Sequence, residues 1–361
     1  MAEVLKIIKA YDFYSPIDTV ERISGGNINK TYKLTTSDGE KYILQKINTS
    51  VFKDPDALMD NVVAVTTRTN AIKKEKSLDK TEFLTIKFTV DGKSYYSGPE
   101  GCYRVYEYMP NSVTGTVAQT ASAVEDAGRA FGLFDRILNC GEPLALHTVI
   151  RDFHNTPKRL ADLCEIYKKA PESRKIGVKS TYEYLVGQGE FLQKNYDFFS
   201  GIERRVVHND VKWSNVAFDR KSGRAVGVLD LDTVMYGCIA DDFGDGVRSF
   251  AGPEKEDEIS IGAIGVDMEK YKAFSRGFIG ELKEILTDDE KAAFICSPIC
   301  IALELAMRFL SDHLGGDVYF HTEYEGQNLN RAKCQAALGR DMETRLPDMQ
   351  KWLKTEVFDG F

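Results

Sequence analysis

The 361-residue chain has few of the residues from which metal centres and disulfide frameworks are built. Its seven cysteines are scattered and odd in number, no Cys-x-x-Cys pair occurs, and there are only five histidines. A zinc site or a disulfide framework is therefore not expected. Cys296 and Cys300 lie one helical turn apart, and we interpret them as small core residues on one helix face.

Long apolar runs and excess positive charge are also absent. The chain has no uninterrupted apolar run of about 18 residues, the length typical of a membrane helix, and its start, MAEVLKIIKAYD, has no signal-peptide pattern. The net charge of -8 disfavours binding to nucleic acid or to an anionic membrane, which both need basic surface. We expect a soluble, cytoplasmic protein without a nucleic-acid or membrane partner; the sequence indicates no oligomeric state.

The first part of the chain, residues 1–109, is rich in β-strand patterns. Tight-turn signals occur at Asp38-Gly39 and at Asp91-Gly92, each between two apolar stretches. The predicted strands cover 30–36, 41–47, 83–90, 93–98 and 102–109. One helix is predicted over 54–75, with Pro55 near its start. An antiparallel sheet that carries one helix fits these patterns.

Helical patterns dominate the second part, residues 110–361, and Pro110 marks the predicted boundary. One predicted helix face carries Ala127, Ala130, Phe131, Phe134 and Leu138. Capping-box spacing, which indicates helix starts, occurs at Ser180/Glu183 and at Thr287/Glu290. Two short β stretches, 204–208 and 225–232, interrupt the helices. The chain is therefore predicted to be an α+β protein with a sheet-containing N-lobe and a mainly helical C-lobe.

The stretch VVHNDVKWSN (206–215) concentrates polar side chains directly after an apolar run. Its H-x-D-x-x-x-x-N spacing is that of a kinase catalytic loop. In phosphoryl transfer the enzyme mainly positions groups and neutralises charge. Asp210 is then the acceptor of the hydroxyl proton, Asn215 a Mg²⁺ ligand, Lys212 a cation near the transferred phosphate and His208 a brace for the loop. The alternative is a polar surface loop after a buried strand.

A second acidic site follows at GVLDLD (227–232). An apolar strand that ends in an acid shortly after the catalytic loop supplies another metal ligand in kinases, and Mg²⁺ prefers such hard oxygen donors. Asp230 is the predicted ligand. Asp232 is predicted to lie on the same strand face, as an outer-sphere or acceptor-binding group. Ordinary solvation of a strand end is the alternative for both acids.

A glycine turn lies between two predicted strands at Ser24-Gly25-Gly26-Asn27-Ile28-Asn29. Backbone N–H groups at such a turn approach phosphates closely. Gly25, Gly26 and Asn29 are therefore candidate nucleotide-binding residues. The segment lacks the Gly-Lys-Ser/Thr of a Walker A motif, and a plain hairpin turn is the alternative.

The strand that carries a phosphate-binding lysine in kinases corresponds here to YILQK (42–46). Gln45 occupies the lysine position, and Lys46 points to the opposite face if the strand is regular. Either Gln45 makes a neutral contact, or a bulge turns Lys46 inward, or other cations take over. The strand end at Glu107 and Met109 corresponds to the adenine-binding hinge, where the backbone makes the contacts.

The helical stretch 301–320 carries a charged stripe of Glu304, Arg308 and Asp312, each one turn from the next. An exposed ladder of ion pairs is one interpretation. The other places Arg308 in the cleft as a phosphate or acceptor clamp, to which a guanidinium is well suited.

Several blocks resemble the aminoglycoside phosphotransferase superfamily, among them HNDVKWSN, LDLDTVM and DDFGDGVRSF. Within it the chain more closely resembles the bacterial N-acetylhexosamine 1-kinases, through GGNINKTYKL, FHNTPKR, MRFLSDHLGGDVYF and other blocks spread over roughly residues 20–340. The resemblance implies a bilobal protein-kinase-like fold. It also implies transfer of the γ-phosphate of ATP, with Mg²⁺, to the anomeric hydroxyl of GlcNAc or GalNAc.

The resemblance also assigns residues. Asp210 carries over as the base, and Asn215 and Asp230 as metal-site residues. The implied acceptor contacts are Thr31, Arg104, Asp230, Arg308 and Tyr319. Glutamine at the strand-lysine position is usual in this subfamily. Two alternatives stay open: a kinase of the same fold for choline, homoserine, methylthioribose or an aminoglycoside, and a nucleotide-binding pseudokinase, which Gln45 in place of the kinase lysine suggests.

Overall fold

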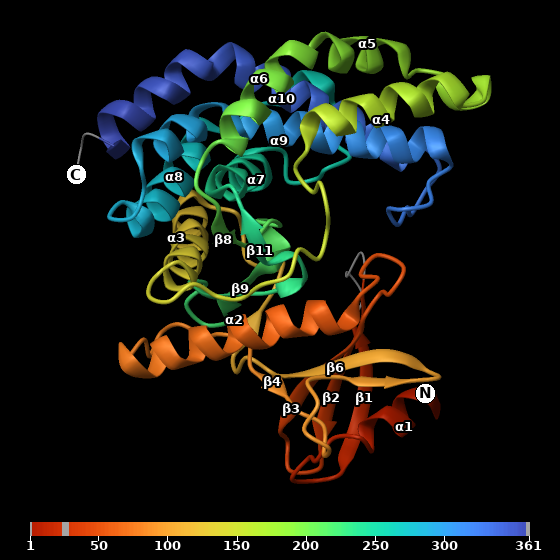
Figure 1. Cartoon of the computed structure of the whole chain (residues 1–361), viewed down its shortest axis with the longest axis vertical. Helices are drawn as coiled ribbons and strands as arrows, with labels where there is room; N and C mark the ends of the chain where they lie inside the picture. Colours follow the sequence, from red (N-terminus) through yellow and green to blue (C-terminus); the bar gives the residue numbers. More distant parts are fainter. Residues whose placement is uncertain (1, 24–28, 359–361) are drawn as a thin grey trace.

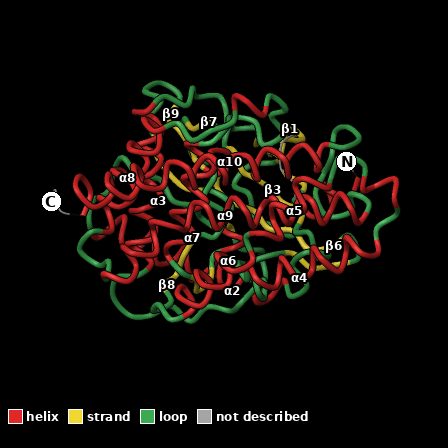
Figure 2. The backbone as a smooth tube through the Cα atoms, turned by 90° about the horizontal axis from the view of Figure 1, so that it is seen from above, coloured by secondary structure: helices red, strands yellow, loops and turns green. Residues whose placement is uncertain are grey.

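The computed structural model describes residues 2–23 and 29–358. Figure 1 shows a sheet-containing N-terminal part below a larger helical part, with helix α2 (Pro55–Glu75) lying between them. Seen from above, helices lie over most of the strands (Figure 2). This arrangement, an antiparallel sheet joined to a helical body, confirms the predicted fold class. The division at residues 109 and 110 stays a prediction.

The N-terminal sheet is antiparallel, and its strand order among the described residues is β1-β2-β3-β6-β4, with β5 also paired to β6. The strands are β1 (Ile17–Ile23), β2 (Lys30–Thr36), β3 (Lys41–Lys46), β4 (Ile86–Lys87), β5 (Tyr96–Gly98) and β6 (Gly101–Glu107). The turn between β2 and β3 is the predicted one. Gly39 adopts a φ of 90° there, which glycine tolerates, and the Asp38 carboxylate accepts a hydrogen bond from the Ser15 hydroxyl.

The second predicted hairpin is wrong. Asp91-Gly92 does turn the chain, with the Thr89 N–H donating to the Lys93 carbonyl, but β4 and β5 do not pair with each other. Both pair with β6, β4 through Ile86 and Tyr106 and β5 through Tyr96 and Tyr103. Pairing of β4 and β5 with the longer strand β6 therefore takes the place of pairing across the turn.

The helical part is built around a large apolar core that also receives one face of α2. Its helices are α3 (Ala121–Leu138), α4 (Thr156–Lys169), α5 (Lys179–Gly187), α6 (Gly189–Ser200), α7 (Ile239–Ala251), α8 (Met268–Leu282), α9 (Asp288–Gly315) and α10 (Gln327–Trp352). The predicted face of α3 is buried at Ala127, Phe131, Phe134 and Leu138. A smaller cluster lies between the sheet and helix α1 (Ala2–Ile8).

Two helix starts were predicted from capping boxes, and one of them is correct. Thr287 and Glu290 form a reciprocal capping box at the start of α9. Helix α5 begins instead at Lys179, with Val178 as its flanking residue, so Ser180 lies inside the helix. Spacing alone does not show that the serine occupies the cap.

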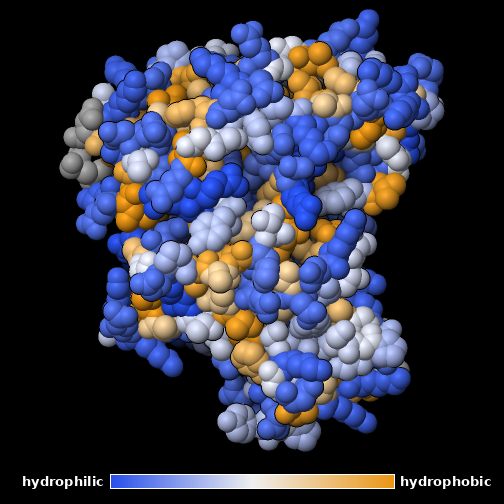
Figure 3. Space-filling model, viewed as in Figure 1, coloured by the Kyte–Doolittle hydropathy of each residue, from blue (hydrophilic) through white to orange (hydrophobic). Residues whose placement is uncertain are grey.

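Helix α9 is long and apolar enough, by length and composition, to cross a membrane, with a mean hydropathy of 1.8 over its best window. That window is 83% buried inside the fold, as expected of a core helix. The face of the molecule in Figure 3 is mostly hydrophilic, and apolar residues show near the middle, where the two parts meet.

Candidate active site

The catalytic-loop sequence leaves strand β8 (Arg205–Val207), which pairs with β11 (Met235–Gly237). His208 is fully buried, and its Nε2 lies 2.9 Å from the Leu229 carbonyl oxygen. Burial lowers the pKa of His208 to about 4, so the ring is neutral and donates that hydrogen bond. The N–H groups of His208 and Asn209 both donate to the Asp242 carboxylate, at 2.6 Å. Asp242 of helix α7 therefore fixes the backbone of the loop.

Asp210 lies at the centre of this loop. Lys212 donates from Nζ to Asp210 Oδ2 at 2.5 Å, and Asn215 donates from Nδ2 to the same oxygen at 2.9 Å. Burial would raise the pKa of Asp210, but the charge of Lys212, the hydrogen bonds from Lys212 and Asn215 and smaller contributions together outweigh burial, and the pKa is lowered. Asp210 is therefore an ionised carboxylate whose two hydrogen-bond donors fix its orientation.

Asp230 follows strand β10 (Ala225–Val228) rather than lying within a strand. It adopts a left-handed backbone conformation, with φ 62°, and Leu231–Thr233 then form a 3₁₀ turn. The prediction that Asp230 and Asp232 share one strand face is therefore wrong, because the strand has already ended. Asp230 lines the cleft, whereas Asp232 is buried and forms an ion pair with Arg104 of the sheet.

Gln45 faces the cleft, and Lys46 does not. Gln45 is the cross-strand partner of Arg104, and its Oε1 accepts hydrogen bonds from Arg104 Nε at 3.0 Å and Nη2 at 2.8 Å. Its Nε2 donates to Thr31 Oγ1 at 3.3 Å. The Lys46 ammonium instead lies 5.2 Å from the centre of the Tyr103 ring, as a regular strand requires.

One cavity of about 380 Å³ brings the two parts of the chain together. It is lined from the catalytic side by Asp210, Lys212 and Asp230, from the sheet side by Asn29, Thr31 and Gln45, and from helix α9 and the following loop by Arg308 and Tyr319. Asn215 is tied to this cavity through Asp210. Arg104 is fully buried behind Gln45, and it does not line the cavity.

Arg308 is held in the cleft by aromatic side chains. Its guanidinium lies 5.4 Å from the Phe153 ring and 5.5 Å from the Phe320 ring, distances at which cation–π attraction operates. The stripe on α9 is not an exposed ladder, because Glu304 is fully buried. Asp312 instead accepts hydrogen bonds from the N–H groups of Val318, Tyr319 and Phe320 at 2.9 Å, which places Tyr319 beside Arg308.

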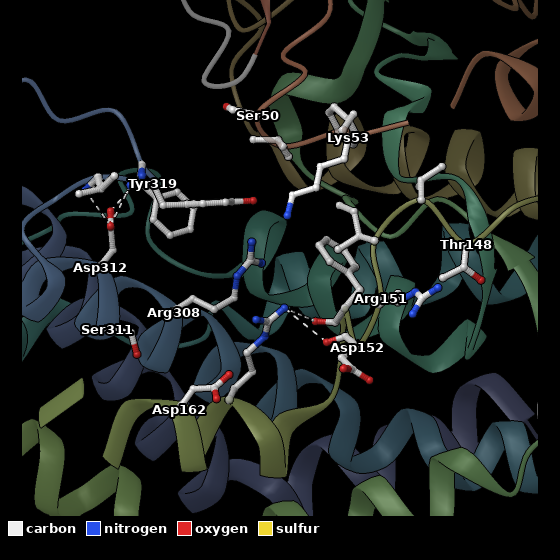
Figure 4. Close-up of a pocket in the computed structure, with 18 of the residues that line it drawn as sticks. Ser50, Lys53, Thr148, Arg151, Asp152, Asp162, Arg308, Ser311, Asp312 and Tyr319 are labelled. Atoms are coloured by element: carbon white, nitrogen blue, oxygen red, sulfur yellow. Dashed lines mark hydrogen bonds between the residues drawn. The ribbon is translucent and has the colours of Figure 1, made fainter. Parts of the chain in front are cut away.

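A second, larger hollow of about 1530 Å³ adjoins the cleft at Arg308 and Tyr319. Figure 4 shows Lys53 and Arg308 entering it from opposite sides, with the Tyr319 hydroxyl directed into the space between them. Arg151 lies on the wall near Thr148. Cations from both parts of the chain therefore surround the outer end of the cleft.

The remaining predicted nucleotide-binding residues are only partly described. Gly25 and Gly26 lie outside the described residues. Glu107 and Met109 lie at the end of β6, where the Glu107 N–H donates to the Thr85 carbonyl and the Met109 carbonyl accepts from Ser112. Neither lines the cavity. Their adenine-binding role stays a prediction.

The oxygen donors beside the cleft fit a hard divalent cation. Asn215 uses its Nδ2 toward Asp210, which leaves its Oδ1 as a donor. Burial, together with the charge of Asp232, raises the pKa of Asp230 to about 7, and a bound cation would relieve this. Among the described residues no group of three His, Cys, Asp or Glu side chains is arranged for a metal. A kinase site needs fewer, because phosphates and waters complete the Mg²⁺ shell.

Sequence reasoning missed several residues that support the site. His154 Nδ1 lies 3.0 Å from Glu304 Oε2, and His154 lines the cleft. Asp135 of α3 is fully buried beside Asp242. His154 lies in FHNTPKR and Asp242 in DDFGDGVRSF, two of the blocks that carry the family resemblance. Their partners are distant in sequence, so only the fold reveals these contacts.

Comparison with known proteins identifies the family. Residues 19–274 match the model of the phosphotransferase enzyme family. Among solved structures, an aminopropanol kinase associated with a microcompartment is 14% identical, with 97% of this chain and 98% of that chain covered and a TM-score of 0.64. An amicoumacin kinase in complex with AMP-PNP and Ca²⁺ is 14% identical, with 99% and 93% covered and a TM-score of 0.58.

A choline kinase from Streptococcus pneumoniae is similar over 91% of this chain and 94% of its own, at 13% identity and a TM-score of 0.52. At such identities these likenesses establish the fold and not the acceptor. The family match covers well over half of the chain. The chain therefore belongs to the phosphotransferase enzyme family, and it shares the fold of these solved kinases.

Proposed function

We propose that the chain uses ATP and Mg²⁺ to phosphorylate the anomeric hydroxyl of an N-acetylhexosamine, GlcNAc or GalNAc. The observation that carries the proposal is the single cavity lined by Asp210, Asp230, Arg308 and Tyr319. It joins a proton acceptor, a metal ligand and hydrogen-bonding groups for a sugar. The blocks that resemble N-acetylhexosamine 1-kinases support the choice of acceptor.

Asp210 is the general base in this proposal. An anomeric hydroxyl is more acidic than an ordinary alcohol, so one ionised carboxylate suffices to accept its proton. The hydrogen bond from Asn215 keeps the carboxylate oriented. Lys212 lies beside Asp210 and offsets negative charge that develops on the transferred phosphoryl group.

Asn215 and Asp230 would hold the divalent cation that accompanies the nucleotide. When bound there, the cation would neutralise the charge of the ATP phosphates. A neighbour of the same fold is named for its complex with AMP-PNP and Ca²⁺, which supports a nucleotide with a divalent cation. In this proposal Asn29 and Gln45 contact the nucleotide from the sheet side of the cavity. Gly25, Gly26, Glu107 and Met109 remain further candidates for nucleotide binding.

The acceptor end of the cleft favours a neutral sugar over an amine. Arg308, Lys53 and Arg151 surround it, and a cationic acceptor would be repelled there. Of the acids that line this hollow, Asp162 and Asp312 are engaged by other groups, whereas Asp152 also faces it. Asp162 pairs with Lys158 at 3.0 Å, and Asp312 is engaged by three backbone N–H groups. Tyr319 and Thr31 supply directed hydrogen bonds to the sugar.

The two alternative functions are disfavoured by the same region. An amine acceptor favours an acidic or aromatic pocket. Of the acids that could provide one, Asp242 binds the backbone of the catalytic loop and Asp245 binds Arg248 at 2.7 Å, and the aromatic rings of Phe153 and Phe320 lie against Arg308. A pseudokinase would be expected to lack one of Asp210, Asn215 and Asp230, and all three are present.

Release of ADP in a coupled assay tests the proposal. The acceptors are GlcNAc, GalNAc, glucose, choline and kanamycin, each with ATP and Mg²⁺. Turnover of the N-acetylhexosamines above the others is expected. Turnover of the amines alone would contradict the sugar assignment, and the absence of turnover on any acceptor would favour the pseudokinase.

A further inference from the structure

A cation is expected on the sheet side of a kinase cleft, and in this chain it comes from an unexpected strand. Position 45 of β3 holds glutamine, and Lys46 lies over the Tyr103 ring. Directly across the ladder from Gln45 is Arg104 of β6. Arg104 is fully buried, and burying a guanidinium is costly unless its charge and its N–H groups are satisfied.

Arg104 is satisfied by two partners from different parts of the chain. Its Nε and Nη2 both donate to Gln45 Oε1, at 3.0 and 2.8 Å, so the glutamine fixes the plane of the guanidinium. Its Nη1 forms an ion pair with Asp232. Burial would lower the pKa of Arg104, but the charge of Asp232, its hydrogen bond and the smaller contributions of Tyr106 and Asp230 together outweigh burial and raise the pKa, so Arg104 stays charged.

Asp232 is tied to the sheet through both carboxylate oxygens. Oδ1 faces Arg104, and Oδ2 accepts a hydrogen bond from Asn29 Nδ2 at 2.6 Å. Asn29 is anchored in turn, because its Oδ1 accepts from the Asn48 N–H at 3.0 Å. Asp232 follows Asp230 in the same tight turn, so these contacts fix the metal-ligand turn against the sheet.

We infer that Arg104 is a positioning residue. Other kinases have a strand lysine that contacts phosphate, whereas this chain has a buried arginine that holds the turn of Asp230 in place through Asp232 and does not contact ligand. Gln45 orients the guanidinium, and its own contact with phosphate is secondary. The inference rests on the proposed nucleotide and metal site, but it is independent of which acceptor is used. It changes the expected role of Arg104, which sequence resemblance had placed among the acceptor contacts.

The first test moves the cation across the ladder. Arg104→Met removes it and leaves Asp232 Oδ1 buried without a partner, while Oδ2 keeps its hydrogen bond from Asn29. Gln45→Lys combined with Arg104→Met places an ammonium on the neighbouring strand, where cross-strand Cβ atoms are about 5 Å apart. Arg104→Met is expected to lower kcat/KM by about 10- to 100-fold, the usual cost of losing an outer-sphere partner of a metal ligand. The double variant is expected to recover about tenfold of that loss.

The second test measures binding without turnover. Trp213 is next to Lys212 and lines the cavity, and the chain has two tryptophans, so Trp352→Phe leaves Trp213 as the fluorescent reporter. In this background AMP-PNP is titrated with and without Mg²⁺. Arg104→Met is expected to weaken binding in the presence of Mg²⁺ by about tenfold or more, and to leave metal-free AMP-PNP binding within about twofold.

Two controls separate positioning from general destabilisation. Leu185→Ala opens a cavity in the core at α5, in the helical part far from the sheet. It serves as a variant that is destabilised, as Arg104→Met is expected to be, but whose cleft is unchanged. Arg104→Lys keeps the charge but loses the paired hydrogen bonds to Gln45, and intermediate activity is expected. All variants are compared well below their melting temperatures.

Three results would overturn the inference. The first is a folded double variant no more active than Arg104→Met. The second is an unchanged Mg²⁺ requirement in Arg104→Met with a raised acceptor KM, which would make Arg104 an acceptor contact. The third is equal weakening of AMP-PNP with and without Mg²⁺. If no N-acetylhexosamine is turned over, the proposed acceptor fails, but the AMP-PNP titration still decides the role of Arg104.

Discussion

Replacing Glu304 by glutamine should abolish an unusual charge on His154. The two side chains are 3.0 Å apart, with exposed fractions of 12% for His154 and 0% for Glu304. Burial would lower the pKa of His154, but the charge of Glu304, with smaller contributions from Asp241 and Asp245, outweighs it and raises the pKa to about 9. At neutral pH His154 is therefore an imidazolium beside the cleft.

The size of the effect follows from the shift. Raising the pKa from 6.5 to about 9 corresponds to about 3 kcal/mol of stability, at about 1.4 kcal/mol per unit. Because the folded-state pKa lies above the unfolded value, this stability is fully present below about pH 6.5 and is lost as the pH rises through about 9. Glu304→Gln should thus cost about 3 kcal/mol at pH 6 and little at pH 10.

Urea unfolding at pH 6 and pH 10 measures this difference, and an NMR titration of the His154 Cε1–H resonance measures its cause. The wild-type resonance should titrate near pH 9, and the Glu304→Gln resonance at a lower pH, because burial is then opposed only by the smaller contributions of Asp241 and Asp245. His313, on the same helix as Glu304, serves as the internal control and should titrate alike in both proteins. A His154 midpoint near 6.5 in the wild type, or one that the substitution leaves in place, would refute the reasoning.

Three further predictions concern the candidate site and the buried acids that support the catalytic loop. Asp210→Asn should lower kcat by about 10²- to 10⁴-fold, the typical contribution of a general base. ATP binding, measured by calorimetry, should stay nearly unchanged. Activity within about tenfold of wild type would exclude Asp210 as the base. Arg308→Lys should raise the acceptor KM by about tenfold, because an ammonium lacks the planar donors of a guanidinium. If steady-state kinetics show a change in the ATP KM alone, Arg308 does not contact the acceptor. Asp135→Asn should flatten the pH dependence of stability. Burial raises the pKa of Asp135 and also raises the pKa of Asp242, to about 7, so wild-type stability declines as the pH rises from about 4 to about 7. Equal slopes in urea unfolding of both proteins would refute this account of the two buried acids.

The sequence predicted the fold where local signals and tertiary packing agree. The β2–β3 hairpin, helix α2 and the capping box at Thr287 all formed as expected, because a turn glycine or a cap determines each one locally. The hairpin at Asp91-Gly92 failed because strand pairing is decided by long-range partners, and β6 competes for both segments.

The loop that carries Asp210 and Asn215 could be located from the sequence, whereas the contacts that hold it could not. The spacing around Asp210 and Asn215 indicated the loop before its geometry was known. The ion pair of Arg104 with Asp232 joins strand β6 to a turn more than a hundred residues away, and no local pattern indicates it. The left-handed conformation of Asp230 likewise ends a strand that continues in the apolar pattern of the sequence.

The most direct test of the central claim is the position of the transferred phosphate. The chain is incubated with ATP, Mg²⁺ and GlcNAc, and the product is examined by phosphorus–proton correlation NMR. Transfer to the anomeric oxygen predicts that the phosphorus couples to the anomeric proton, and that Asp210→Asn yields almost none of this product. Phosphorus coupled to the protons at C6, or undiminished product from Asp210→Asn, would contradict the account.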